Sequence, residues 1–294
     1  MVVLVTGSGG QLGQSLQFVS QNYPEIDFVF CNSSELDITD LDNINKIFKQ
    51  YKPQFCINTA AYTAVDKAES EPEKVNLINV IGVKNLAQVC KDFETILLHI
   101  STDFVFDGNA SKPYSEVDLT NPTGVYGQTK LDGEKEIQSI LNDYYIIRTS
   151  WVFSQFGNNF MKTMLRLASE RDSISVVNDQ VGTPTNAVDL ANVLLSIINF
   201  KPPTSNLQPS FGIYNFSNQG QCSWFDFAAE IFKQNNNVID LKPIPSSQFP
   251  TPAKRPSYSV LDKSKIENWL KIEIKSWQES LKTVDFSVTK EKKP

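Results

Sequence analysis

The first thirteen residues constrain the fold most strongly, because they join an extended apolar run to a glycine-rich turn. Residues 1–6 (MVVLVT) are rich in β-branched side chains, and residues 7–13 (GSGGQLG) place Gly7, Gly10 and Gly13 three residues apart. A helix-like stretch follows. Strand, glycine turn and helix in this order are the context of a dinucleotide-binding site, where glycines permit a tight turn and a close approach of the backbone to a pyrophosphate. The pattern predicts a nucleotide-binding turn, and a generic glycine-rich loop is the alternative.

The rest of the first half alternates strand-like and helix-like segments. Further strands are expected at 27–31, 55–58, 95–100 and 144–147, with helical patterns between them. Such alternation predicts an α/β fold with a doubly wound parallel sheet, in which ligands bind beyond the carboxyl ends of the strands. Small or polar residues follow four of these ends, namely Gly7, Ala60, Thr102 and the segment 148–151 (RTSW).

After Trp151 the regular alternation weakens, which indicates a change in architecture. We expect a dinucleotide-binding domain at 1–150, to which segments near 174–216 return, and a mainly substrate-binding part at 151–294. Proline- and polar-rich sequence at 201–210 indicates a surface excursion, and the lysine-rich end indicates a frayed tail.

Charge and hydropathy argue against two classes of partner. The formal net charge of -6 argues against nucleic acid as the main partner. No apolar run approaches the roughly 20 residues that a membrane-spanning helix needs. The first residues also lack the basic region and cleavage site of a signal peptide. We therefore expect a cytoplasmic protein that does not associate with membranes.

Four scattered cysteines and a single histidine limit the chemistry that the chain can perform. Because no Cys-x-x-Cys pair occurs, clustered zinc ligands are lacking and we predict no metal site. His99 lies in the strand-like run 96–100 (ILLHI), which favours a buried core histidine over a catalytic one. The cysteines indicate small buried side chains in a reducing compartment. They are Cys31, Cys56, Cys90 and Cys222.

The candidate catalytic chemistry lies in residues 125–134 (VYGQTKLDGE). In a helix, Tyr126 and Lys130 share one face, one turn apart. An ammonium a few ångströms from a phenol favours the phenolate, so Lys130 is expected to lower the pKa of Tyr126 and make it a general acid or base near neutral pH. The same spacing also arises by accident in many chains. Thr102, upstream in Ser-Thr-Asp, is a candidate partner, although this triplet is also common in turns.

The end of the second expected strand does not decide between NADPH and NADH. An acidic residue there would bind the ribose 2′-hydroxyl of NADH, and an arginine would bind the 2′-phosphate of NADPH. Residues 31–34 (CNSS) contain neither. Asp37 and Ile38 follow, near the expected position of an adenine.

Seven segments together resemble the extended short-chain dehydrogenase/reductase family. They run through most of the chain in the family's order, and seven matches in order are far more specific than one. The segments are 6–13 (TGSGGQLG), 58–69 (NTAAYTAVDKAE), 100–108 (ISTDFVFDG), 126–134 (YGQTKLDGE), 148–153 (RTSWVF), 180–185 (QVGTPT) and 255–256 (RP).

This resemblance implies a Rossmann-type doubly wound sheet with a smaller, interleaved α+β domain that holds the substrate. It implies NADPH or NADH as coenzyme and reduction of the C4 carbonyl of a nucleotide-sugar, a dTDP-linked deoxyhexulose. The catalytic set carried over is Thr102, Tyr126 and Lys130. The implied coenzyme contacts are Gly7, Gly10, Gln11, Leu12, Gly13, Asp37, Ile38, Ala60, Ala61, Tyr62, Asn79, Tyr126 and Lys130. The implied substrate contacts are Thr102, Asp103, Phe104, Trp151, Asn159, Phe160, Gln180 and Arg255.

Phe104 departs from the family pattern, which commonly has tyrosine in STDYVF, and this puts the identity of the sugar in doubt. Two other functions stay open. One is a nucleotide-sugar epimerase or dehydratase of the same superfamily, which regenerates its coenzyme in each cycle. The other is a catalytically silent, coenzyme-binding regulatory subunit, since a fold alone does not determine function. The sequence leaves the oligomeric state open, with a homodimer as one option.

Overall fold

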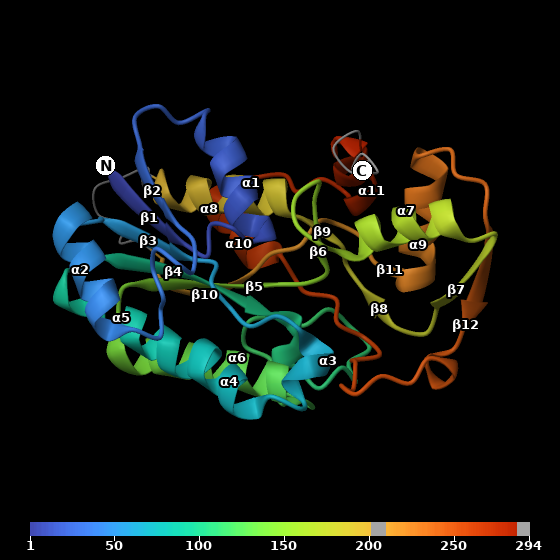
Figure 1. The fold of residues 1–294 in the computed structure, drawn as a ribbon, viewed down its shortest axis with the longest axis horizontal. Helices are drawn as coiled ribbons and strands as arrows, with labels where there is room; N and C mark the ends of the chain where they lie inside the picture. The colour runs from blue at the N-terminus through green and yellow to red at the C-terminus, as the bar shows by residue number, and fades with distance from the viewer. Residues whose placement is uncertain (201–209, 287–294) are drawn as a thin grey trace.

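A six-stranded parallel sheet forms the centre of the molecule (Figure 1). The computed structural model describes residues 1–200 and 210–286, so the expected excursion (apart from residue 210) and the end of the tail lie outside the described residues. Within these ranges the sheet has the order β10-β5-β4-β3-β1-β2, and all its pairs are parallel. Its strands are β1 (Val2–Thr6), β2 (Asp27–Cys31), β3 (Phe55–Asn58), β4 (Ile96–Thr102), β5 (Tyr144–Thr149) and β10 (Gly212–Asn215). The predicted doubly wound α/β fold is confirmed.

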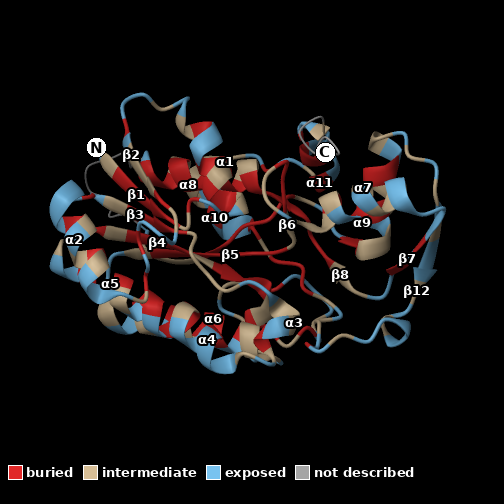
Figure 2. Ribbon diagram, viewed as in Figure 1, coloured by how far each residue is buried: buried red, intermediate tan, exposed pale blue. Residues whose placement is uncertain are grey.

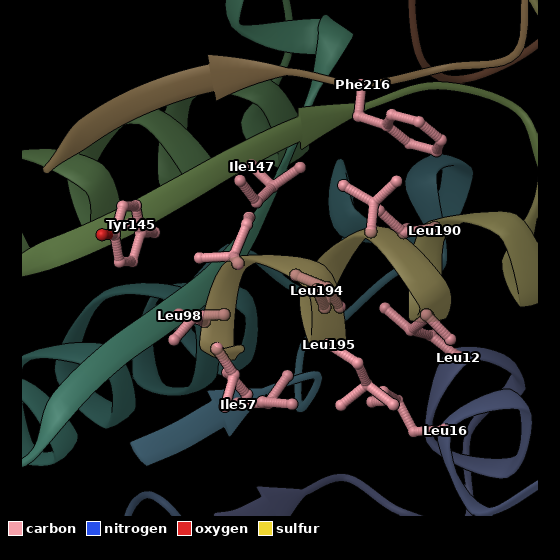
Figure 3. Close-up of a cluster of buried hydrophobic side chains, with 14 of the residues drawn as sticks. Leu12, Leu16, Ile57, Leu98, Tyr145, Ile147, Leu190, Leu194, Leu195 and Phe216 are labelled. Carbon is pink, nitrogen blue, oxygen red and sulfur yellow. The ribbon is translucent and has the colours of Figure 1, made fainter. Parts of the chain in front are cut away.

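Helices cover both faces of this sheet (Figure 1). One face carries α1 (Gln11–Ser20), α8 (Ala187–Ile198) and α10 (Ser264–Leu270), and the other carries α2 (Leu41–Tyr51), α5 (Val83–Asp92) and α6 (Val125–Ile140). Figure 3 shows leucines of α8 among apolar side chains of α1 and of the strands. Buried residues accordingly concentrate along the strands (Figure 2).

The chain changes direction across the sheet between β1 and β3. From β1 it moves to β2 on one side, and it then crosses to β3, β4 and β5 on the other. In such sheets ligands bind where the strand order reverses, beyond the carboxyl ends. Gly7 follows β1 directly and Ala60 lies two residues beyond the end of β3, so both of these expected coenzyme residues lie at this point.

A second, smaller group of elements lies at one end of the sheet (Figure 1). Its core is built around Phe153, Met161, Phe227 and Trp277. The chain leaves this group to add α8, β10 and α10 to the larger part, so the two parts are interleaved. The proposed boundary at residue 150 stays a prediction. The elements of the group are β6 (Val152–Phe153), α7 (Phe160–Glu170), β7 (Ser173–Val177), β8 (Val181–Gly182), β9 (Thr185–Asn186), β11 (Cys222–Ser223), α9 (Trp224–Gln234), β12 (Asp240–Ile244), η3 (Ser246–Gln248) and α11 (Trp277–Lys282).

The helix expected after β3 contains a π-helical segment. It runs as α4 (Pro72–Asn76), η1 (Leu77–Gly82) and α5, and it is preceded by the short α3 (Val65–Ala68). The wider π turn carries Asn79, which is fully buried. A single-turn 3-10 helix, η2 (Asp103–Val105), follows β4. π turns inside helices are frequent near functional sites.

The burial of the cysteines and of His99 was predicted, as was the lack of a membrane-spanning helix. The four cysteines are buried and unbridged, and His99 is fully buried in β4, as expected. Within residues 1–200 and 210–286, no helix combines the length and the apolar character needed to cross a bilayer.

Candidate active site

The glycine turn between β1 and α1 is packed too closely for side chains. Gly7 has a positive φ of 66°, and a Cβ on it would lie 2.6 Å from the backbone nitrogen of Ala60. A Cβ on Gly13 would lie 2.5 Å from Ser8 Cα. Helix α1 begins after Gly10, and residues 11–14, which form its first turn, include no acidic residue. The turn therefore presents backbone N–H groups and a helix dipole, which together favour a phosphate group.

The other residues of the turn contact the protein through their side chains. Leu12 packs into the core between α1 and the sheet. The Gln11 amide donates to the carbonyl of Val152 (3.1 Å), and its oxygen accepts from Asn159 (2.6 Å). Leu12 can therefore reach a coenzyme only through its backbone, and Gln11 joins the turn to the smaller part of the molecule.

Beyond β2, the predicted adenine neighbours differ in exposure. Asp37 is exposed and accepts hydrogen bonds from the backbone and hydroxyl of Thr39 (2.9 and 2.8 Å). Ile38 is buried and packs against Gly82. The strand end itself folds into a turn in which Asn32 Oδ1 accepts from the Ser34 backbone N–H (2.8 Å) and the Glu35 carboxylate accepts from the Asn32 backbone N–H (2.8 Å). An acidic side chain therefore does lie at this end of β2.

The segment after β3 is held by Asn79. Its amide oxygen accepts from the Tyr62 backbone N–H (2.9 Å), and its amide nitrogen donates to the Tyr62 carbonyl (3.1 Å). Ala60, Ala61 and Tyr62 are each partly exposed. Asn79 therefore shapes the loop that flanks the crevice, and its own side chain is occupied.

Thr102, Asp103 and Tyr126 meet at the carboxyl end of β4. The Thr102 hydroxyl donates to Asp103 Oδ1 (3.0 Å), and it lies close enough to the Tyr126 phenol to lower the pKa of Tyr126. Burial raises the pKa of Asp103 to about 6. Within residues 1–200 and 210–286, no group hydrogen-bonds Asp103 Oδ2. The Phe104 ring packs edge-on against Tyr126, with ring centres 5.6 Å apart.

The prediction that Lys130 lowers the pKa of Tyr126 is wrong for this structure. The Lys130 amine is buried, donates to the carbonyl of Ile100 (2.7 Å) and lies 3.1 Å from His99 Nε2. Burial raises the pKa of Tyr126 to about 12, the neighbouring Thr102 hydroxyl opposes this rise, and the charge of Asp103 adds to it. The physical reason is that burial makes the charged form of both side chains costly. It raises the pKa of the phenol and, in the same way, lowers the pKa of Lys130 to about 8.

A buried ion pair lies one helical turn beyond Lys130. Glu134 accepts two hydrogen bonds from the Arg148 guanidinium (2.9 and 2.6 Å) and one from the Ser101 hydroxyl (2.5 Å). Breaking such a pair costs several kcal/mol, because an uncompensated charge is left inside. The pair ties α6 to β4 and β5, and so positions the helix that carries Tyr126.

Aromatic side chains gather in the smaller part of the molecule. Trp151 has a positive φ of 46° and stacks on Trp224, with ring centres 3.6 Å apart. Phe160 lies 4.7 Å from the same Trp224 ring. Asn159 caps α7 through the Lys162 backbone N–H (3.0 Å). Gln180, just before β8, is partly exposed.

Arg255 is engaged by an acidic side chain in this structure. Its guanidinium donates to both carboxylate oxygens of Asp66 in α3 (3.0 and 2.7 Å). The pair connects the smaller part of the molecule to the loop after β3, next to Tyr62. Arg255 therefore lies beside the crevice, with two of its donors occupied.

Sequence reasoning missed several residues around the site. Glu134 lies in the quoted segment 126–134, and Arg148 lies in the quoted segment 148–153. The four-residue spacing from Lys130 to Glu134 would have placed Glu134 on the same face of the helix. Trp224 lies in none of the quoted segments, because its role depends on side-chain packing between distant segments. Asp66 lies in the quoted segment 58–69, but that segment does not indicate its pairing with Arg255. His99 was expected to be a core residue, and its contact with Lys130 was not foreseen.

Comparisons with known proteins show which family the chain belongs to. Residues 1–288 match the family model described as RmlD substrate binding domain. The dTDP-4-dehydrorhamnose reductase of Aggregatibacter actinomycetemcomitans is 41% identical over 96% of this chain and 97% of its own length.

Two solved structures have the same fold over nearly the whole chain. A dTDP-4-dehydrorhamnose reductase from Clostridium acetobutylicum has a TM-score of 0.89 at 41% identity, covering 96% of this chain and 97% of that one. The Bacillus anthracis enzyme of that name, in complex with NADP, has a TM-score of 0.89 at 37% identity, covering 95% and 96%. The chain belongs to the RmlD substrate binding domain family, together with these dTDP-4-dehydrorhamnose reductases.

Proposed function

We propose that this protein catalyses the NADPH- or NADH-dependent reduction of the C4 carbonyl of dTDP-6-deoxy-L-lyxo-4-hexulose to give dTDP-L-rhamnose. The observation that carries the proposal is the pair of hydroxyls at the end of β4. The Tyr126 phenol and the Thr102 hydroxyl lie close together beyond the carboxyl end of β4, in a chain whose glycine turn fits a pyrophosphate. Relatives of 41% and 37% identity are named for this reaction, and one of them binds NADP.

A bound NADPH or NADH supplies a hydride to the C4 carbon. Gly7, Gly10 and Gly13 would let a bound pyrophosphate approach the backbone N–H groups at the start of α1. Lys130, whose amine is buried against Ile100 and His99, would have to turn toward the neighbouring ribose to contact it. The close approach at Gly7 and Gly13 supports this assignment, because a Cβ at either position would collide with the protein backbone and displace the turn.

Tyr126 donates the proton that completes the reduction. As C4 is reduced, negative charge develops on O4, and the phenol gives its proton to that oxygen. The raised pKa keeps Tyr126 protonated at neutral pH, which is the form that a proton donor requires. Rotation of the Thr102 hydroxyl from Asp103 toward O4 adds a second hydrogen bond. Solvent then returns a proton to the Tyr126 phenolate.

The sugar lies between this hydroxyl pair and the aromatic side of the crevice. Asp103 Oδ2 has no hydrogen-bond partner among the described residues but is buried, so a sugar hydroxyl would reach it only after the neighbouring side chains move. Trp151 would contact the sugar with the part of its ring that Trp224 does not cover. Asn159, Phe160, Gln180 and Arg255 extend the substrate site toward the smaller part of the molecule. Phe104 supplies an apolar edge where a tyrosine hydroxyl is common in the family.

The test is an absorbance assay at the reduced-nicotinamide band with dTDP-6-deoxy-L-lyxo-4-hexulose and each coenzyme in turn. We expect one coenzyme oxidised for each sugar reduced. Sugar conversion without net coenzyme oxidation would indicate an epimerase or dehydratase instead. Coenzyme binding without any turnover would indicate a regulatory subunit.

The proposal extends to the setting in which the enzyme acts. Four unbridged cysteines suit a reducing cytoplasm, and the substrate is a soluble nucleotide-sugar. We also propose a homodimer, which light scattering would test by returning twice the mass of one chain.

A further inference from the structure

The helix that carries Tyr126 begins without a cap of its own. Helix α6 starts at Val125, and Gly124 before it has no side chain that could accept from the first backbone N–H groups. A helix start without an acceptor leaves N–H groups unpaired and is prone to fray. Tyr126 is the second residue of this first turn, so the position of the phenol depends on how firmly the turn is held.

A carboxylate from another part of the chain takes the place of the missing cap. Glu69, directly after α3, accepts a hydrogen bond from the Val125 backbone N–H through Oε1 (2.9 Å). The same Oε1 would lie 2.7 Å from a Cβ on Gly124, so it occupies the space in which a cap side chain would begin. A negative charge at this end of a helix is also favourable for the helix dipole. Glu69 therefore supplies what residue 124 lacks.

The short helix from which Glu69 extends is itself anchored. Ala68, the last residue of α3, is fully buried. Asp66 accepts from the Arg255 guanidinium (2.7 Å) and from the Ala253 backbone N–H (3.3 Å). Because α3 is held both by burial and by the segment that contains Arg255, it can restrain the start of α6 rather than follow its movements.

The residue that follows Tyr126 is also held in place. A Cβ on Gly127 would lie 2.2 Å from the Phe104 carbonyl oxygen, so the first turn of α6 packs directly against the backbone of η2. The Phe104 ring packs edge-on against Tyr126 itself. The two residues that flank Tyr126 are therefore both restrained, one by Glu69 and the other by the backbone of Phe104.

We propose that Glu69 is a positioning residue, which caps α6 from α3 and so holds Tyr126 where its phenol can deliver a proton. Glu69 acts through the Val125 backbone N–H, without a contact of its own to the substrate or the coenzyme. The inference rests on the proposed function for its effect on turnover, but not for the hydrogen bond that caps the helix. The two parts can therefore be tested separately.

Glu69→Ala removes the acceptor and should lower turnover. Loss of a helix cap shifts the equilibrium at the helix start by about fivefold, and a displaced reacting group costs more, so we expect kcat to fall by about tenfold. The coenzyme Kd should stay within about twofold of the wild-type value, because the glycine turn is unchanged.

Two further variants separate positioning from a general loss of stability. Glu69→Gln keeps an oxygen at the same place and loses only the charge, so kcat should stay within about threefold of wild type. Glu25→Ala removes an exposed carboxylate before β2 and should change neither kcat nor the coenzyme Kd. An equal loss of kcat in Glu69→Ala and Glu69→Gln, or no loss in Glu69→Ala, would overturn the proposal.

Gly124→Ser tests whether a cap within the helix makes Glu69 dispensable. The added Cβ would displace the Glu69 carboxylate, which is the end of a flexible side chain, and serine is a favoured N-cap residue. The backbone at residue 124 is already extended, as an N-cap requires. In the Gly124→Ser background we expect Glu69→Ala to lower kcat by less than about twofold, against about tenfold alone. A loss of about tenfold in both backgrounds would contradict capping as the role of Glu69.

The hydrogen bond itself can be measured without substrate, by NMR detection of hydrogen exchange at the Val125 backbone amide. We expect exchange about fivefold faster in Glu69→Ala than in the wild-type protein, and a rate close to wild type in Glu69→Gln. Equal rates in Glu69→Ala and the wild-type protein would refute the cap. Faster exchange in Glu69→Ala, together with no reductase turnover by the wild-type protein, would support the cap and contradict the proposed function instead.

Discussion

The coenzyme side and the sugar side of the crevice are built in different ways. On the coenzyme side, backbone geometry forms the site: a positive φ at Gly7, contacts of 2.5 and 2.6 Å that exclude a Cβ, and the start of α1. On the sugar side, side chains that hold one another form the site, such as Trp151 on Trp224 and Arg255 on Asp66. From this difference we expect a single substitution in the glycine turn to cause a large loss of coenzyme binding. A single substitution among the side chains of the sugar side should cause only a small loss of sugar binding.

The largest effect is expected from a side chain added to the glycine turn. Gly13→Val places a Cβ 2.5 Å from Ser8 Cα, so the turn must shift. Overpacking of this kind costs roughly 1–3 kcal/mol, which corresponds to a loss of up to about 100-fold in coenzyme affinity. Gly9→Ala is the matched control, because its Cβ would meet only Asn32 Cβ at 3.8 Å. Coenzyme binding is measured by fluorescence titration. Equal coenzyme affinity in both variants would contradict the claim that close backbone packing forms the coenzyme side.

Lys130→Met should make the protein more stable while it impairs function. Burial lowers the Lys130 pKa from 10.5 to about 8. The unfolded chain therefore binds an extra proton between these pH values, so the native protein gains stability as pH rises from about 8 to 10.5. Below pH 8 the full penalty applies, at about 1.4 kcal/mol per pKa unit, reduced by the lost bond to Ile100. Urea unfolding should show a gain of about 1–3 kcal/mol at pH 7 that shrinks at pH 10. A loss of stability at pH 7 would contradict the account.

Trp224→Leu tests the sugar side. The stacked partner of Trp151 is removed, and aromatic pairs contribute about 0.5–1.5 kcal/mol. We expect the KM for the sugar to rise up to about tenfold, with coenzyme affinity unchanged. Phe249→Leu, an exposed aromatic change in the same part of the chain, should alter neither value. A rise in the coenzyme Kd as large as the rise in KM would show that the two sides are not separable.

Asp66→Asn should have the smallest effect. The pair with Arg255 is partly exposed, at 39% for Asp66 and 26% for Arg255, and such pairs contribute less than about 1 kcal/mol. Thermal unfolding should change little, and the KM for the sugar should change less than about fivefold. A tenfold effect on either quantity would assign Asp66 a direct part in the site.

The same division explains what could be predicted from the sequence. The doubly wound sheet and the glycine turn follow from local patterns, because β-branched runs and glycines constrain the backbone wherever they occur. β2 and β3 have the bounds that these patterns predict. The Tyr126 and Lys130 helix was also predicted, since its spacing is a property of one segment.

Electrostatics at the site could not be predicted in this way. Spacing alone placed Lys130 near Tyr126, but the amine lies against His99 and Ile100, and burial raises the phenol pKa instead of lowering it. Desolvation depends on the whole surrounding structure, which no short motif contains. Arg255 and Asp66 are 189 positions apart in the sequence, so their pairing could not be predicted from local patterns either.

The most direct test of the central claim is to measure kcat and coenzyme Kd for Tyr126→Phe beside the wild-type protein, with dTDP-6-deoxy-L-lyxo-4-hexulose as substrate. Removal of the hydroxyl takes away the proton donor and leaves the aromatic ring that packs against Phe104. The account predicts that kcat falls by about 10²–10⁴-fold while the coenzyme Kd stays within about twofold. A variant that retains near-normal kcat would contradict the assignment of Tyr126 as the proton donor.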